Sequence, residues 1–191
     1  MSKTKTLTPK TSRSDIFMSI KPEHMYNIST RAKNHEYRRY LLPASVRRIW
    51  FYTTAPHSRL EYVARVSPGK TPGEVPEDGG IGNEDFNSGR KVSKYAYEIL
   101  DLWRLREPIS LKGAISEGWL KGAPQKYCWV PVALLERVPM DKQDHVFSRP
   151  EEEKPERRKV DDREEAKKAP TSSPAGRKKI SDFFTQSDPK D

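Results

Sequence analysis

The chain has a single cysteine, Cys128, among 191 residues, so neither a disulfide framework nor a cysteine-based metal cluster can form within it. This favours an intracellular location, where thiols stay reduced. No apolar stretch approaches the roughly 20 residues that cross a bilayer, and the N-terminus lacks the apolar segment of a secretory signal. The four histidines show no metal-ligand spacing, and no Gly-rich phosphate motif is present. We therefore expect no membrane association, no metal and no cofactor.

Residues that can build a core are scarce and unevenly distributed. Hydrophobic residues make up 34% of the chain and charged residues 33%, which is an apolar-poor composition for a globular protein. All four tryptophans lie between residues 15 and 138, whereas the large apolar side chains of residues 148–191 are only Val160, Ile180, Phe183 and Phe184. A segment so polar cannot bury enough surface to fold. We predict one domain at 13–147, between a disordered basic arm at 1–12 and a disordered charged tail at 148–191.

The net charge of +9 is concentrated in the arm and the domain. The arm has three lysines and no acidic residue, and residues 13–147 carry 21 lysines and arginines against 16 acidic residues. A basic domain with a basic arm indicates a polyanionic partner, most often nucleic acid. The alternative is a basic protein whose charge serves solubility alone.

The sequence pattern predicts an α+β domain. Pro22 is placed to begin a helix, residues 67–82 form a long Pro/Gly loop, and no βαβ unit repeats. The predicted strands are 15–20, 35–42, 46–54, 59–66, 125–131 and one from 95 to a turn at Glu107-Pro108. Short helices are expected near 83–88 and 111–119, and 132–138 is either a closing strand or a helical turn. We expect a curled, barrel-like sheet of five to six strands with two or three short helices.

The segment from Met18 to Tyr40 resembles the opening of an ASCH domain, a PUA-like family. The pattern is a strand ending Ser-x-Lys-Pro, a helix, and then Lys-x-x-Glu-x-Arg on the next strand. The residues that match it are Ser19, Lys21, Pro22, Lys33, Glu36 and Arg38. Two later stretches, Tyr52 to Pro56 and Tyr97 to Leu111, also fit, so the resemblance covers about residues 15–138. It implies a PUA-like curled β-barrel.

The resemblance further implies that three cations, Lys21, Lys33 and Arg38, converge on a cleft with Glu36 between them. Cations suit a phosphate, and a carboxylate accepts from an exocyclic amine of a base. The alternative is that Glu36 forms structural ion pairs with its neighbours, because alternate residues of a strand share a face.

A dense basic and aromatic stretch follows the motif. Arginines interleaved with tyrosines on a sheet suit single-stranded nucleic acid, because bases stack on rings while arginines follow phosphates. The predicted ligand is RNA or single-stranded DNA. The alternative is a solvated strand with its tyrosines in the core. Trp119 is the tryptophan best placed to contact a ligand, because glycines put it on a loop. The stretch comprises Tyr37, Arg38, Arg39, Tyr40, Arg47 and Arg48, and the predicted nucleic-acid-binding residues are Lys21, Lys33, Glu36, Arg38, Arg39 and Arg48.

Some ASCH-like proteins are small hydrolases that remove an acyl group from modified cytidine. Their pattern has a lysine near Lys33, a threonine three positions later, and a further glutamate. Here Glu36 stands in the threonine position, so the hydroxyl is missing and binding is favoured over catalysis. If the chain is an enzyme, an amidohydrolase or ribonuclease, Lys33 and Glu36 would be its catalytic residues. The later glutamate would be Glu61 or Glu98.

The tail carries two kinds of docking signal. Clusters of lysine and arginine near 157–159, 167–168 and 177–179 are of the kind that nuclear import receptors bind, so we expect a nuclear location. The segment 177–184 resembles the box by which replication and repair proteins bind the sliding clamp, PCNA. Ile180, Phe183 and Phe184 would share one face of a helical turn, and Arg177 replaces the usual leading glutamine. A third hypothesis is a non-enzymatic adaptor that binds the clamp and another protein.

Overall fold

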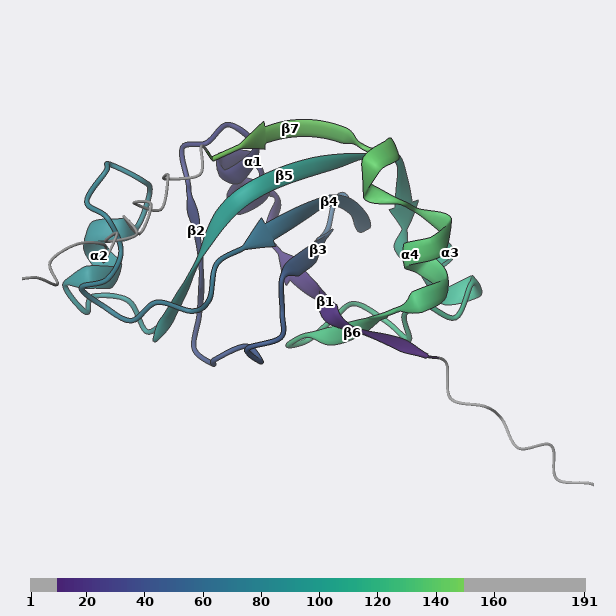
Figure 1. Ribbon diagram of the computed structural model, residues 1–191, viewed down its shortest axis with the longest axis horizontal. Coiled ribbons are helices and arrows are strands. Elements are labelled where there is room, and N and C mark those ends of the chain that lie inside the picture. Colours follow the sequence, from purple (N-terminus) through teal and green to yellow (C-terminus); the bar gives the residue numbers. More distant parts are fainter. Residues whose placement is uncertain (1–9, 150–191) are drawn as a thin grey trace, which may run out of the picture. The chain divides into compact units, whose positions relative to one another are not determined.

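The computed structural model describes residues 10–149, which form a single sheet with helices packed on it (Figure 1). In chain order the elements are β1 (Thr11–Ile20), α1 (Pro22–Ser29), β2 (His35–Arg38), β3 (Arg48–Thr53), β4 (Arg59–Val66), α2 (Asn83–Asn87), β5 (Tyr95–Ser110), α3 (Leu111–Ser116), β6 (Cys128–Pro131), α4 (Val132–Arg137), the 3-10 helix η1 (Met140–Lys142) and β7 (Asp144–Ser148).

The seven strands are ordered β2-β5-β4-β3-β1-β6, and β7 pairs with β5. β1 and β3 are parallel, whereas the other pairs are antiparallel. The long strand β5 spans the domain. Its first residues pair with β2, and its later residues pair with β4 on one edge and β7 on the other.

Apolar side chains cover both faces of the sheet. Along β1, Ile16, Met18 and Ile20 face one core cluster, which includes Met25 and Ile28 of α1. Phe17 faces the opposite cluster, which α3 and α4 cover. Strands buried on both faces need apolar residues at consecutive positions. The sequences of the central strands are therefore short apolar runs and not a strict alternation of apolar and polar residues.

The sheet curls but does not close. Arg38 on β2 donates to the backbone carbonyl of Ser19 on β1 at 2.8 Å, although these strands lie far apart in the strand order. The Arg38 side chain, and not a row of backbone hydrogen bonds, therefore connects β2 with β1. This confirms the predicted curled α+β architecture.

The structure corrects several predicted elements. Residues 10–149 hold seven strands and four α-helices instead of five to six strands and two to three helices, and the segment predicted as a closing strand or a helical turn forms helix α4. β5 continues through the predicted turn at Glu107-Pro108. Its pairing with β4 is irregular between Arg104 and Ile109, and a proline, which has no backbone N–H, is tolerated at such a place. β7 was not predicted, since it is short and exposed. β1 begins inside the predicted arm, and β7 ends one residue into the predicted tail.

The Pro/Gly loop is fastened to β2 through Asn83. The Asn83 side-chain amide accepts from the Tyr37 hydroxyl at 2.5 Å and donates to the Pro76 carbonyl at 3.0 Å. Gly80 lies so close to Asn34 that an added Cβ would be 2.4 Å from its side-chain oxygen. The loop therefore packs against the strand that carries the candidate site.

Candidate functional site

Three of the predicted site residues converge in a buried ion cluster. Glu36 forms ion pairs with Lys33 and, at 2.6 Å, with Arg38. Glu36 is 2% exposed and Lys33 is 5% exposed, while Arg38 is partly accessible. Glu36 and Arg38 share a face of β2 because strand side chains alternate. We call Lys33, Glu36 and Arg38 the charged triad.

Arg38 is also held on its other side. Its Nε lies 2.9 Å from the Met18 sulfur, and its Nη2 donates to the Ser19 carbonyl at 2.8 Å. The guanidinium is therefore fixed by Glu36 and by β1 together. A cation positioned in this way loses little conformational entropy when it binds a ligand.

The pKa values of Glu36 and of its neighbour His24 are both lowered, for different reasons. Burial alone would raise the pKa of Glu36, but the positive charges of Lys33 and Arg38 outweigh burial and lower this pKa below its usual value. Burial lowers the pKa of His24, and the charges of Lys33 and, more weakly, Lys21 act in the same direction.

A cavity of about 190 Å³ adjoins the triad at Lys33. Glu98 also lines it and forms ion pairs with Arg149 and, at 2.6 Å, with Lys70. The sequence left open whether Glu61 or Glu98 belongs with Lys33. Glu61 instead pairs with Arg59 at 2.9 Å beside a different hollow, so Glu98 is the glutamate that shares a cavity with Lys33.

Tyr40, which follows the triad residue Arg38 closely in sequence, packs against Tyr127 from a distant segment, and both tyrosines are half-buried. Their ring centroids are 5.9 Å apart, and the Lys126 ammonium lies 4.5 Å from the Tyr40 centroid and 5.6 Å from the Tyr127 centroid. The Tyr40 hydroxyl donates to the Lys126 carbonyl at 2.9 Å. We call Tyr40, Lys126 and Tyr127 the tyrosine platform. It offers stacking surface beside a cation.

The remaining predicted binding residues are more dispersed. Lys21 is exposed at the start of α1, and Arg39 is exposed directly after β2. Arg48 forms an ion pair at 2.6 Å with Asp15, which is fully buried. Tyr37 is buried, so of the two tyrosines in the basic stretch only Tyr40 reaches the platform.

Sequence reasoning missed Lys126 and Tyr127. The segment 125–131 was interpreted only as a strand, although a lysine beside a tyrosine there repeats the basic and aromatic pairing seen at 38–40. That pairing was the available signal.

Within residues 10–149, no group of three or more His, Cys, Asp or Glu side chains is arranged to hold a metal ion. No helix in that range is long and apolar enough to span a membrane.

Two solved structures of ASCH proteins share this fold. The ASCH protein of Zymomonas mobilis is 22% identical, with a TM-score of 0.51 over 66% of this chain and 94% of that chain. A single-residue mutant of the same protein is 20% identical, with a TM-score of 0.50 over 65% of this chain and 96% of that chain. No protein-family model and no curated protein matches the sequence. Residues 10–149 therefore have an ASCH-like fold.

His35, which lies between Lys33 and Glu36 in sequence, gives the domain a testable pH dependence. The ring is fully buried, and its Nε2 has no hydrogen-bond partner. Burial, with the Lys70 charge, lowers the pKa of His35 from 6.5 to about 4. Because the unfolded chain binds this proton more readily, stability is complete above pH 6.5 and is lost as pH falls toward 4, by roughly 3 kcal/mol. His35→Gln should remove this loss in urea unfolding.

The measurement is best made in a His24→Gln background, since the pKa of His24 is also lowered. The matched control is His145→Gln, because His145 is exposed. Glu36 affects the pH dependence of stability only below about pH 4.5, because its pKa is lowered from that value. An unchanged slope between pH 6.5 and 4.5 in His35→Gln would contradict the assignment.

Proposed function

We propose that this ASCH-fold domain binds single-stranded nucleic acid, RNA or DNA, through the tyrosine platform and the cations beside it. The observation that carries the proposal is the Tyr40–Tyr127 ring pair at 5.9 Å with Lys126 over both rings. Stacking of bases on aromatic rings does not depend on sequence, and lysines and arginines follow the backbone phosphates.

Charge and fold support the same proposal. Residues 10–149 carry 23 lysines and arginines against 16 acidic residues, which favours a polyanion. The likeness to ASCH structures concerns the fold, and the PUA-like resemblance adds an expectation of RNA binding. In this proposal Arg38 and Arg39 contact phosphates, while Glu36, being buried, positions Arg38 instead of contacting a base.

The proposal extends to the tail, which lies outside the described residues. Its lysine and arginine clusters would engage a nuclear import receptor, and Ile180, Phe183 and Phe184 would bind the sliding clamp PCNA. The domain would then act on nucleic acid in the nucleus at sites where the clamp is loaded.

Tyr127→Ala should weaken binding of the full chain to single strands about tenfold, because one base loses its stacking partner. Lys126→Ala should lower the slope of log affinity against log salt by about 0.7, since one phosphate contact is lost. Fluorescence anisotropy with single-stranded RNA, single-stranded DNA and duplex DNA across a salt series measures both effects and identifies the preferred polymer.

Tyr26→Ala is the matched control, because Tyr26 is an exposed tyrosine on α1 outside the platform. Equal losses in Tyr26→Ala and Tyr127→Ala would exclude the platform as the interface. If the full chain binds none of the three polymers, nucleic-acid binding is wrong and the adaptor hypothesis stands in its place.

For the tail we expect Phe183→Ala combined with Phe184→Ala to weaken PCNA binding at least about tenfold, since two aromatic anchors are removed. Arg177→Gln should instead tighten binding, because it supplies the glutamine that usually leads this box. Isothermal titration of the full chain with PCNA measures both. Clamp binding that survives the double phenylalanine variant would exclude the motif.

A second candidate function is hydrolysis of acylated cytidine, which the shared cavity of Lys33 and Glu98 favours. Lys33→Ala and Glu98→Gln should each abolish turnover, whereas Glu61→Gln, at the other hollow, should retain it. The readout is release of cytidine from a panel of N-acylated cytidines by the full chain. Absence of turnover across the panel would remove this function.

A further inference from the structure

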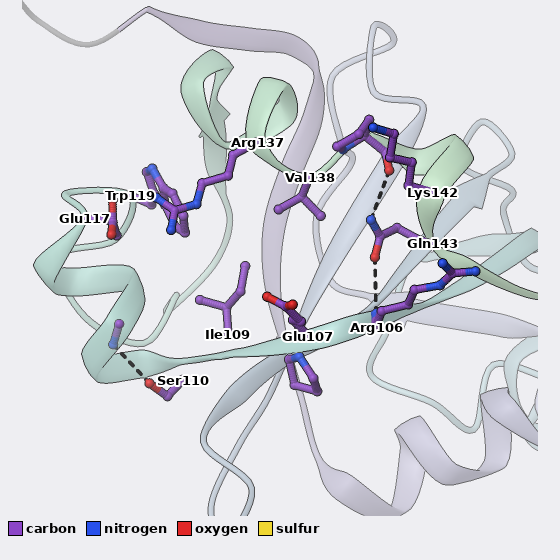
Figure 2. Close-up of a pocket in the computed structure, with 13 residues that line it drawn as sticks. Arg106, Glu107, Ile109, Ser110, Glu117, Trp119, Arg137, Val138, Lys142 and Gln143 are labelled. Carbon is purple, nitrogen blue, oxygen red and sulfur yellow. Dashed lines mark hydrogen bonds and ion pairs between the residues drawn. The ribbon is translucent and has the colours of Figure 1, made fainter.

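A separate groove of about 550 Å³ lies at the far end of β5 from the charged triad. It is formed by the end of β5, by α3 with the loop that follows it, and by the turn from α4 into η1 (Figure 2). None of the triad or platform residues lines it. The groove therefore needs its own explanation.

Local sequence places Trp119 in one wall of this groove. The Ser110 hydroxyl accepts from the Gly113 N–H at 3.0 Å and begins α3. Gly118 ends the helical segment with a φ of 72°, in the left-handed region that favours glycine. The Trp119 backbone N–H then donates to the Ala114 carbonyl at 2.9 Å. The start and end signals of α3 therefore fix the backbone that carries the indole.

The Arg137 guanidinium lies over this indole, 5.5 Å from the ring centroid. It also forms an ion pair with Glu117 at 3.3 Å. Trp119 and Arg137 thus make a planar wall, in which the Arg137 charge is balanced by Glu117. Planar aromatic and guanidinium groups are the surfaces on which nucleobases stack.

A carboxylate without a partner faces this wall. Figure 2 shows Glu107 near the middle of the groove, with Trp119 on one side and Lys142 on the other. Within the described residues the Glu107 carboxylate makes no hydrogen bond or ion pair. The nearby Arg106 guanidinium is paired with Asp144 at 2.7 Å, so it does not neutralise Glu107.

An unpaired carboxylate beside a stacking wall favours one base in particular. Two carboxylate oxygens accept two adjacent N–H donors, and guanine presents two on one edge, the ring N1–H and the 2-amino group. Adenine and cytosine place a ring acceptor beside their amine, and uracil flanks its single N–H with two carbonyls. A carboxylate repels those acceptors.

We propose that this groove binds a guanine nucleotide, with the base stacked on Trp119 and Arg137 and its Watson–Crick edge on Glu107. The nucleotide phosphate meets the cations at the rim of the groove. The guanine comes either from a free nucleotide or from a single strand. The groove and the platform share no residue, so this proposal does not depend on the proposed function.

The test uses the full chain with 15N-labelled tryptophan indoles, observed by NMR, with Trp119 assigned through Trp119→Phe. GMP should shift the Trp119 resonance, and IMP, which lacks the 2-amino group, should bind about tenfold more weakly. Glu107→Gln should weaken GMP binding about tenfold and remove the preference over IMP, because an amide accepts only one of the two donors. Glu136→Gln, an exposed glutamate on α4 outside the groove, should leave binding unchanged.

Two results would overturn the proposal: GMP binding no tighter than UMP, or GMP binding unchanged in Glu107→Gln. A guanine-containing single strand that binds more tightly than GMP, judged by the same resonance, assigns the groove to a strand, and equal affinity assigns it to the free nucleotide. Tyr127→Ala should leave the GMP response intact, so failure of the platform and failure of the groove are distinguishable.

Discussion

The buried Glu36 carboxylate imposes the constraint on which this end of the domain depends. A charge out of water costs several kcal/mol unless cations and hydrogen bonds compensate, and here Lys33 and Arg38 supply them. Lys33 is delivered by the turn after α1, where its N–H donates to the Asn27 carbonyl at 2.8 Å. Arg38 also reaches Ser19 on β1. Satisfying one carboxylate therefore fixes α1, β2 and β1 relative to one another and curls the sheet.

The same electrostatic requirement decides which cations are available to a ligand. Arg48 is committed to the buried Asp15, Arg65 to Asp101 and Arg59 to Glu61. Net charge therefore overstates the basic surface, because many arginines balance internal carboxylates. Lys126, which lies over Tyr40 and Tyr127, carries the binding argument at the tyrosine platform. Arg137 beside Trp119 is paired with Glu117 and offers a planar stacking surface.

The sequence predicted correctly those features that depend on residues close together in the chain, such as the start of α1. Pro22 starts α1 as expected. The family resemblance implied that Lys21, Lys33 and Arg38 gather around Glu36, and Lys33 and Arg38 do so, whereas Lys21 is exposed. Tyr127 could not be predicted in the same way, since its contact with Tyr40 joins segments far apart in the chain. The sequence pattern assigned Tyr37 and Tyr40 similar roles. The structure separates them, because the buried Tyr37 hydroxyl donates to Asn83 at the start of α2.

The turn predicted at Glu107-Pro108 is not present, but these residues do mark an irregularity in the pairing of β5 with β4. The sequence predicted a turn, whereas β5 continues, but its ladder with β4 lapses between Arg104 and Ile109. The Arg106 N–H there donates to the Gln143 side chain at 3.2 Å instead of to a strand. A proline breaks the ladder wherever its missing N–H would be needed. The irregular register lets this part of β5 depart from regular pairing with β4, and it places Glu107 in the groove.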